Sequence, residues 1–314
     1  MIRLSKILVP VDLHSSEGEA VDFGVSLAIR FHAQLELAHV VPPLRVFNFD
    51  SPERMDYLEM QACSEAKEQM PTLVPGRYQA AVHLQSIVKT GNVQEEVLEI
   101  IRNDKIDLIV MGTHRRGSLS RFFLGSTTEN ILRRVPVPIL TVPQLNSEHE
   151  VREYSGVTMH RIVYAADLSS STRLGLHYAA EFAKMFNAKL TILHVMDAFE
   201  PGYGAVEPIS YLQEDRIKLK ENVVVSMENL LKAEYLNGRY PEAVVIEGSP
   251  HQTITHFAEE HGADLVILNL QSKGFLERAM LGATAERVIR SARVPVLSLP
   301  IATADAYMDT RFAA

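Results

Sequence analysis

The chain has 314 residues, of which 46% are hydrophobic and 22% are charged, and its formal net charge is −8. This length suits two hydrophobic cores of ordinary size, and the negative charge argues against a nucleic acid or an anionic membrane as the main partner, because both favour basic surfaces. The single cysteine, Cys63, excludes a disulfide framework within the chain and fits a reducing compartment.

The start of the sequence predicts a cytoplasmic location. Its first apolar run, Ile7 to Val9, ends at Pro10 and is too short for the core of a signal peptide. No stretch approaches the roughly 18 consecutive apolar residues of a membrane span. The 12 His are scattered without a metal-binding spacing, so that no metal site is expected.

Strand and helix patterns alternate along the first half of the chain. Short apolar runs rich in β-branched residues indicate strands buried on both faces, and these runs are residues 6–11, 34–41, 82–88, 106–112 and 137–142. Helical spacing of apolar residues follows each of the first four runs, at residues 20–31, 53–70, 93–101 and from 126 onward. The apolar stripe of residues 53–70 is consistent with core packing or with contact to a partner. Alternation of this kind predicts a parallel, doubly wound α/β sheet, in which ligands bind beyond the carboxyl ends of the strands.

The second half of the chain repeats the first. The sequence "KILVPVDLHSS" returns as "RIVYAADLSSS", and Asp12 and Asp167 take equivalent places 155 residues apart. Later in each copy, Gly91 and Gly248 are equivalent at a separation of 157 residues, so that a net insertion of two residues relates the copies. Self-similarity of this length predicts two copies of one domain.

The predicted domains are residues 1–143 and 159–300. Residues 144–158 between them are polar and lack a clear period, as expected for a linker, and residues 301–314 form a tail. The predicted fold class is therefore α/β, with two tandem repeats of a doubly wound five-stranded parallel sheet.

The stretch "GTHRRGSLSRFFLGSTTENIL", residues 112–132, has the composition of an anion site. Gly112 ends the fourth strand, and Gly125 precedes a helix that Ser126 and Glu129 can start as a capping box. The free backbone N–H groups of a helix start favour an anion such as phosphate, and three arginines nearby add positive charge. The alternative is that Ser126 only caps the helix and that the arginines are solvated.

The sequences "ILVPVD" and "MGTHRRGSLSRFFLGSTTENILRRVPVPILTV" resemble those of the universal stress protein family, and the repeat resembles that of its tandem members. The resemblance covers about residues 1–143 and 159–300. It implies a Rossmann-like fold of the adenine nucleotide alpha-hydrolase type, with ATP, with or without Mg²⁺, as the ligand. The implied contacts to the adenosine come from Pro10, Val11, Asp12 and Val40, and those to the ribose and phosphates come from Met111, Gly112, Gly125, Ser126 and Thr127.

Two residues of the phosphate stretch leave alternatives open. The family's motif has glycine where this chain has Arg115. A side chain at a position that needs positive φ costs about 1 to 3 kcal/mol and can block the pocket, whereas a guanidinium beside phosphates can gain about 1.5 to 3 kcal/mol. His114 either donates a hydrogen bond to the nucleotide or is an exposed loop residue.

The second copy departs further from the motif. Its four motif positions hold Asn269, Ser272, Gly282 and Ala283, so that one glycine remains. Ala283 removes both a hydroxyl near the phosphates and a good helix cap, which alone contributes about 1 kcal/mol. Asp167 is retained, and we expect this copy to bind ATP weakly or not at all.

The residues favour binding over catalysis. The sequence contains no Walker A, GxGxxG or GxSxG motif, and no base for Ser126 is evident. We therefore expect a sensor or regulator of the stress response that binds an adenine nucleotide and is not a fast enzyme. The alternatives are a nucleotide-free interaction module whose pocket is blocked by Arg115 and, third, a slow ATPase.

The family resemblance also implies how the two copies associate. Members often pair through the last strand, which corresponds here to residues 137–143 and 294–300. We expect an intramolecular pseudo-dimer of the two domains, and a homodimer of the whole chain is compatible with the same arrangement.

Overall fold

The computed structural model describes residues 2–13, 18–43, 52–113, 124–143, 157–169, 171–197, 209–231, 241–270 and 281–300. Contacts among these residues divide them into two compact units, each drawn almost entirely from one half of the chain. Each unit contains five strands and has its own buried apolar side chains.

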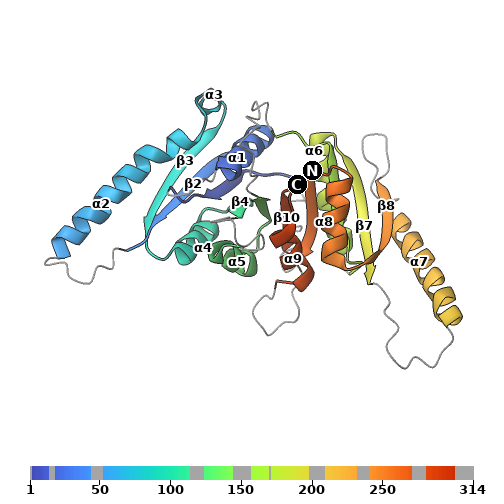
Figure 1. Cartoon of the computed structure of the whole chain (residues 1–314). Coiled ribbons are helices and arrows are strands. Elements are labelled where there is room, and N and C mark those ends of the chain that lie inside the picture. Colours follow the sequence, from blue (N-terminus) through green and yellow to red (C-terminus); the bar gives the residue numbers. More distant parts are fainter. Residues whose placement is uncertain are drawn as a thin grey trace. The chain divides into compact units, whose positions relative to one another are not determined.

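The first unit is a parallel sheet with helices on both faces. Its strands are β1 (Lys6–Pro10), β2 (Gln34–Val41), β3 (His83–Thr90), β4 (Leu108–Thr113) and β5 (Ile139–Pro143), in the spatial order β3-β2-β1-β4-β5. Its helices are α1 (Gly18–Phe31), α2 (Pro52–Gln69), α3 (Gly76–Gln79), α4 (Val93–Asn103) and α5 (Ser126–Arg134), with a 3-10 turn η1 at Met70–Leu73. Figure 1 shows α1 on one side of this sheet and α4 with α5 on the other. The strand order reverses between β1 and β4, because the chain leaves β1 toward β2 and β3 and then returns to the other side of β1.

The middle of the central strand of this unit consists of buried aliphatic side chains. Ile7, Leu8 and Val9 of β1 have no exposed surface, as expected for a strand covered on both faces. Gly24 lets α1 approach the sheet closely, since a Cβ atom there would lie 3.3 Å from Leu35 Cδ1 and would collide with Val9. The tight packing of α1 occupies one face of the sheet, and α4 and α5 cover the other.

A buried aspartate ties the start of β1 to the start of β4. Asp107 Oδ2 accepts hydrogen bonds from the backbone N–H groups of Ser5 (2.6 Å) and Lys6 (3.0 Å). Asp264 Oδ2 accepts the two equivalent bonds, at 2.7 and 2.9 Å, in the second unit. The repeat in the sequence therefore preserves a side-chain anchor as well as the apolar pattern.

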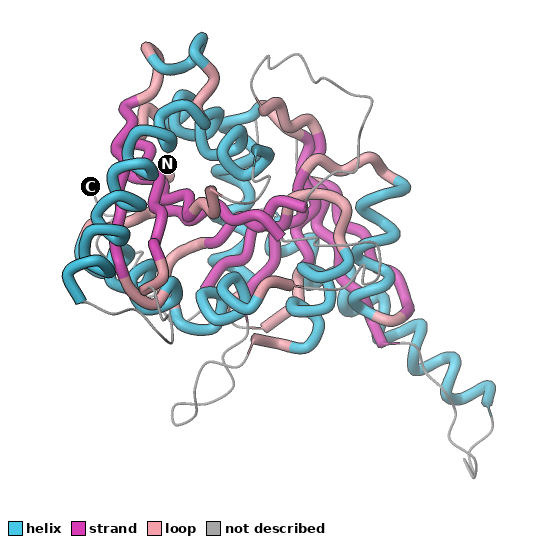
Figure 2. The backbone as a smooth tube through the Cα atoms, turned by 60° about the vertical axis from the view of Figure 1, so that its left-hand side comes forward, coloured by secondary structure: helices cyan, strands magenta, loops and turns pink. Residues whose placement is uncertain are grey.

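The second unit has the same topology. Its strands are β6 (Arg161–Ala165), β7 (Lys189–Asp197), β8 (Glu242–Gly248), β9 (Leu265–Leu270) and β10 (Val296–Pro300), in the order β8-β7-β6-β9-β10. Its helices are α6 (Thr172–Phe186), α7 (Ile209–Leu231), α8 (Pro250–Glu260) and α9 (Ala283–Ser291). Figure 2 shows strands with helices packed around them in each unit.

The predicted fold class is confirmed, because both units are doubly wound α/β sheets of parallel strands. Some element bounds differ by one or two residues: the third strand, predicted at 82–88, is His83–Thr90, and the helix predicted at 53–70 ends at Gln69. Most of the linker at 144–158 and all of the tail at 301–314 lie outside the described residues. The packing of the two domains through their last strands stays a prediction. Within the described ranges, no helix combines the length and the apolarity needed to cross a bilayer.

Candidate functional site

A cavity of about 750 Å³ opens at the carboxyl ends of β1, β2 and β4 in the first unit. It lies where the strand order reverses, which is the usual ligand position in open α/β sheets. Helix α2, the start of α4 and the start of α5 complete its walls. Its volume falls in the range of small-molecule and cofactor sites, about 300 to 1,000 Å³.

All nine residues that the family resemblance implied line this cavity. They are Pro10, Val11, Asp12, Val40, Met111, Gly112, Gly125, Ser126 and Thr127. The two further candidates, His114 and Arg115, lie outside the described residues. The structure therefore brings together segments that are up to 117 residues apart in the printed sequence.

The start of α5 supplies the polar end of the cavity. Gly125 is the N-cap residue, with φ −55° and ψ 141°, and no side chain of the described residues caps the helix. Ser126 is thus the first helical residue rather than the cap, and Glu129 pairs with Arg133 at 2.9 Å, so the predicted capping box is wrong. Because glycine has no capping side chain, the N–H groups at this helix start remain suited to an anion.

Gly112 leaves open space above the end of β4. A Cβ atom at this position would meet only the Cβ atom of Ala20, at 4.0 Å, among the described residues. Nearby, the Thr128 hydroxyl lies 3.5 Å from the Gly112 carbonyl oxygen, and the Thr128 side chain is buried. The protein thus leaves space between the strand end and α5 instead of filling it with side chains.

The ends of β1 and β2 are fixed by two bonds around Val11. The Val11 N–H donates to the Ala38 carbonyl at 2.8 Å, and the His39 Nδ1 lies 2.8 Å from the Val11 carbonyl oxygen. A carbonyl only accepts, so Nδ1 of His39 carries the proton and donates. In the second unit His194 makes the same bond to the Ala166 carbonyl at 2.8 Å, so the repeat preserves this contact at the strand end. These bonds hold the segment that carries Asp12.

Sequence reasoning missed the wall that α2 contributes. Ala62, Glu65, Ala66 and Gln69 line the cavity. Their stretch was assigned to core packing or to a partner surface, because small residues on a helix carry no chemical signal of a ligand. The nearest sequence signal is that two alanines four residues apart share one helix face with the buried core.

The equivalent place in the second unit is filled by the protein's own side chains. Asn269 stands where the first unit has Gly112, and its amide donates to the Tyr164 hydroxyl at 3.0 Å and to the Ser171 carbonyl at 3.2 Å. The Tyr164 hydroxyl in turn donates to the Thr172 carbonyl at 3.1 Å. Gly175 makes room for this network, because a Cβ atom there would collide with the side chains of Asn269 and Tyr164.

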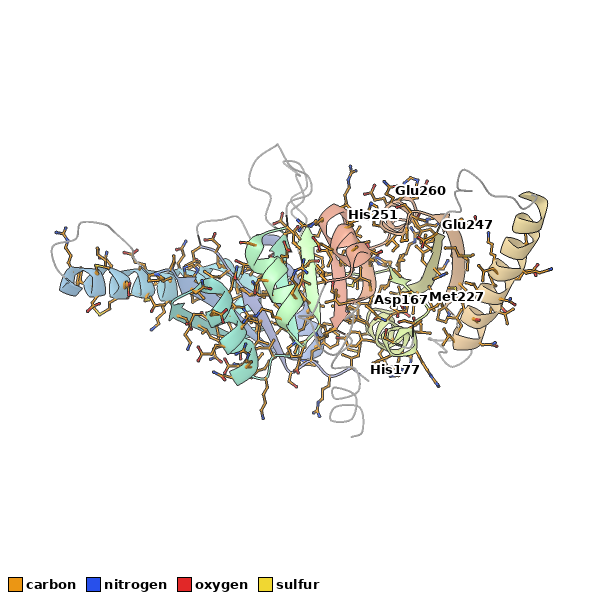
Figure 3. All side chains as sticks on the ribbon, turned by 90° about the horizontal axis from the view of Figure 1, so that it is seen from below. Asp167, His177, Met227, Glu247, His251 and Glu260 are labelled. Carbon is orange, nitrogen blue, oxygen red and sulfur yellow. The ribbon has the colours of Figure 1, made fainter. Side chains whose placement is uncertain are left out.

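Asp167 is also engaged within the second unit. Its Oδ1 accepts from the backbone N–H and the hydroxyl of Ser169, at 3.1 and 2.8 Å, and from the Thr172 hydroxyl at 2.9 Å. Figure 3 labels Asp167 among the side chains of this unit. Burial raises the pKa of Tyr164, and the charge of Asp167 raises it further, so the tyrosine stays a neutral donor.

Two other motif positions of the second unit complete the comparison. Gly282 is the N-cap and Ala283 the first residue of α9, whereas Ser272 lies outside the described residues. A cavity of about 650 Å³ is present in this unit, but it is lined by the last turns of α7 and by Leu168, Ser169, Thr172 and Arg173. Neither Asp167 nor Asn269 lines it.

Comparisons with known proteins agree with the fold and the repeat. A family model described as the universal stress protein family matches residues 4–143 and 158–300. A universal stress protein of Methanocaldococcus jannaschii is 33% identical over 141 residues, which cover 44% of this chain and 79% of that protein. One of Mycolicibacterium smegmatis is 23% identical over 303 residues, covering 93% of this chain and 95% of the relative. The crystal structure of a universal stress protein from Archaeoglobus fulgidus shares the fold with a TM-score of 0.65 and 22% identity, covering 94% of this chain and 98% of that one.

Proposed function

Because the chain belongs to the universal stress protein family as a tandem member, we propose that its first unit binds an adenine nucleotide, ATP, with or without Mg²⁺. The observation that carries this proposal is the gathering of the motif residues around one cavity, between the strand ends and the start of α5. The second unit serves as a structural partner that does not bind nucleotide.

The phosphate end of the proposed site is the start of α5. Gly125 provides no side chain that would compete for the N–H groups of the first turn, and Ser126 and Thr127 bring hydroxyls to the same wall. Such a helix start attracts anions through its N–H groups and its dipole. The triphosphate would lie here, beside the space above Gly112.

The adenosine end lies toward β1 and β2. Asp12 follows β1, and a carboxylate accepts hydrogen bonds from ribose hydroxyls. Val40 and Met111 supply apolar contacts on either side of the strand-order reversal. The cavity thus has one end that attracts anions and another end that combines apolar contacts with a hydrogen-bond acceptor. These two ends suit the phosphates and the nucleoside of a nucleoside triphosphate, respectively.

The same arrangement supports a regulatory role instead of rapid turnover. Among the described residues that line the cavity there is no lysine, and the carboxylates are Asp12 and Glu65, the latter on α2. Phosphoryl transfer requires groups that stabilise the charge on the phosphates and orient the attacking water. We expect bound ATP to bias a conformation or an assembly, with hydrolysis slow or absent.

Calorimetric titration of the full, nucleotide-stripped chain with ATP tests the proposal. The parent should bind one ATP per chain. Asp12→Ala should lower the affinity at least about tenfold, because the ribose then loses its hydrogen bond to the charged carboxylate. Asp167→Ala is the matched control, since it makes the equivalent change in the unit whose crevice is filled, and it should leave binding unchanged. Two sites per chain, or equal loss in both variants, would contradict the assignment to the first unit.

The variant Arg115→Gly separates the proposal from its main alternative. If the parent does not bind ATP and this variant does, the pocket is formed but blocked, and the protein acts through partners without nucleotide. Tighter binding in the parent than in the variant would place the guanidinium among the phosphate contacts.

A further inference from the structure

Helix α2 forms a wall of the cavity that lies at the opposite end from α5. It packs on β2 and β3, whereas α5 packs on β4. Two alanines of this wall, Ala62 and Ala66, face the cavity together with Val97 of α4. Together with the strand ends, these short apolar side chains form an apolar slot of the kind that accommodates a flat aromatic ring.

The size of the residue at position 66 keeps this slot open. Ala66 is 4% exposed and stands four residues before Met70, which is fully buried. Because Ala66 lines the cavity, a longer side chain at this position would extend into it.

The mouth of the slot carries a carboxylate with capacity to accept hydrogen bonds. Glu65 Oε1 accepts from the Gln61 side chain at 2.9 Å. No other partner of Glu65 is found among the described residues, and Glu65 lines the cavity. A carboxylate has two oxygens with about four lone-pair sites and no donor, so this end of the cavity favours a ligand group that donates.

We infer that α2 selects the base of the nucleotide, with Ala66 giving the purine ring its space and Glu65 accepting a hydrogen bond from the exocyclic amine of adenine. This inference rests on the proposed function and specifies it further. A purine with a carbonyl at the same ring position, as in ITP, would place an acceptor against the carboxylate. A site that presents an acceptor to a base rejects the analogue that lacks the donor.

Titration of the full chain with ATP and ITP tests the role of Glu65. The parent should bind ATP at least about tenfold more tightly than ITP. Glu65→Gln should reduce this ratio to about threefold or less, because an amide offers both a donor and an acceptor. Glu68→Gln is the control: it makes the same change one turn away, at an exposed residue that does not line the cavity, and the ratio should stay that of the parent.

Titration with inorganic tripolyphosphate tests the role of Ala66. Ala66→Met should lower the affinity for ATP at least about tenfold, because the longer side chain enters the ring slot, and leave the affinity for tripolyphosphate at the parent value. Retained tripolyphosphate binding and an unchanged unfolding midpoint would show that the variant is folded. Unchanged ATP affinity in Ala66→Met, or equal ATP and ITP affinities in the parent, would overturn the inference while ATP binding itself stands. Failure of the parent to bind ATP would remove the proposed function and this inference together.

Discussion

Asp107 shows how much of the first unit depends on a single side chain. It is fully buried, and one oxygen receives two backbone N–H groups at the start of β1. Asp107→Ala leaves both donors without their partner, at a cost of about 1 to 3 kcal/mol for each. We expect the amides of β1 to lose protection in hydrogen exchange and the first unit to unfold at lower urea concentration.

The equivalent change in the second unit is the control for this prediction. Asp264→Ala removes the bonds to His160 and Arg161 and should reduce protection in β6 while leaving β1 as it was. Loss of protection in both units from either variant would contradict the view that each unit has its own anchor.

Single residues of the site could be predicted from the sequence only where a motif marks them. Asp12, Gly112 and Gly125 stand at fixed distances from strand patterns, so the sequence placed them at one crevice. Ala66 and Glu65 carry no such mark, because alanine and glutamate are ordinary residues of any helix. Their position in the cavity depends on how α2 packs against the sheet, which the sequence pattern does not determine.

At the scale of elements, the start of α5 carries the anion-binding role. An aspartate at position 125 would provide the capping carboxylate that the glycine lacks, and its charge would compete with and repel a phosphate group. We expect Gly125→Asp to lower the affinity for ATP at least about tenfold in calorimetry, with thermal stability equal to that of the parent or slightly higher.

Gly282→Asp provides the matched change at the N-cap of α9. It should raise the stability of the second unit slightly, by a few tenths of a kcal/mol, without any effect on ATP binding. An ATP affinity that is equally low in both variants would show that the effect is not local to α5.

Elements were predictable because their signals are local. Buried strands and amphipathic helices follow from runs and spacings of apolar residues, and the repeat doubled the evidence for each element. The capping box failed for a physical reason: Gly125 takes the extended N-cap conformation, so that Ser126 enters the helix and Glu129 turns to Arg133. Sequence spacing alone fixes a cap only to within a residue or two.

At the scale of the whole molecule, the association of the two domains is a prediction from the family resemblance. Residues 1–143 produced alone should self-associate, because the apolar last strand would lose its expected partner at 294–300. Size-exclusion chromatography with light scattering measures this. A monodisperse monomer of residues 1–143 that remains folded would contradict packing through the last strands.

The duplication also explains why one chain can hold one binding unit and one closed unit. Where the first unit has Gly112 and Ala20, the second has Asn269 and Gly175. The missing side chain at Gly175 leaves the space that the Asn269 amide occupies. The sequence indicated that the second motif is degenerate, but not that its crevice is filled by a satisfied polar network. That result depends on Tyr164 and Asn269 meeting in space, which motif spacing does not report.

Hydrogen exchange of the full chain with and without saturating ATP tests the central claim most directly. A ligand that binds only the folded first unit stabilises that unit, by about 2.7 kcal/mol at a concentration of 100 times Kd. We predict new protection at the end of β1, in the last turns of α2 and in the first turn of α5, with none in β6, α7 or α9. Protection confined to the second unit, or absent throughout, would contradict the assignment of the nucleotide site.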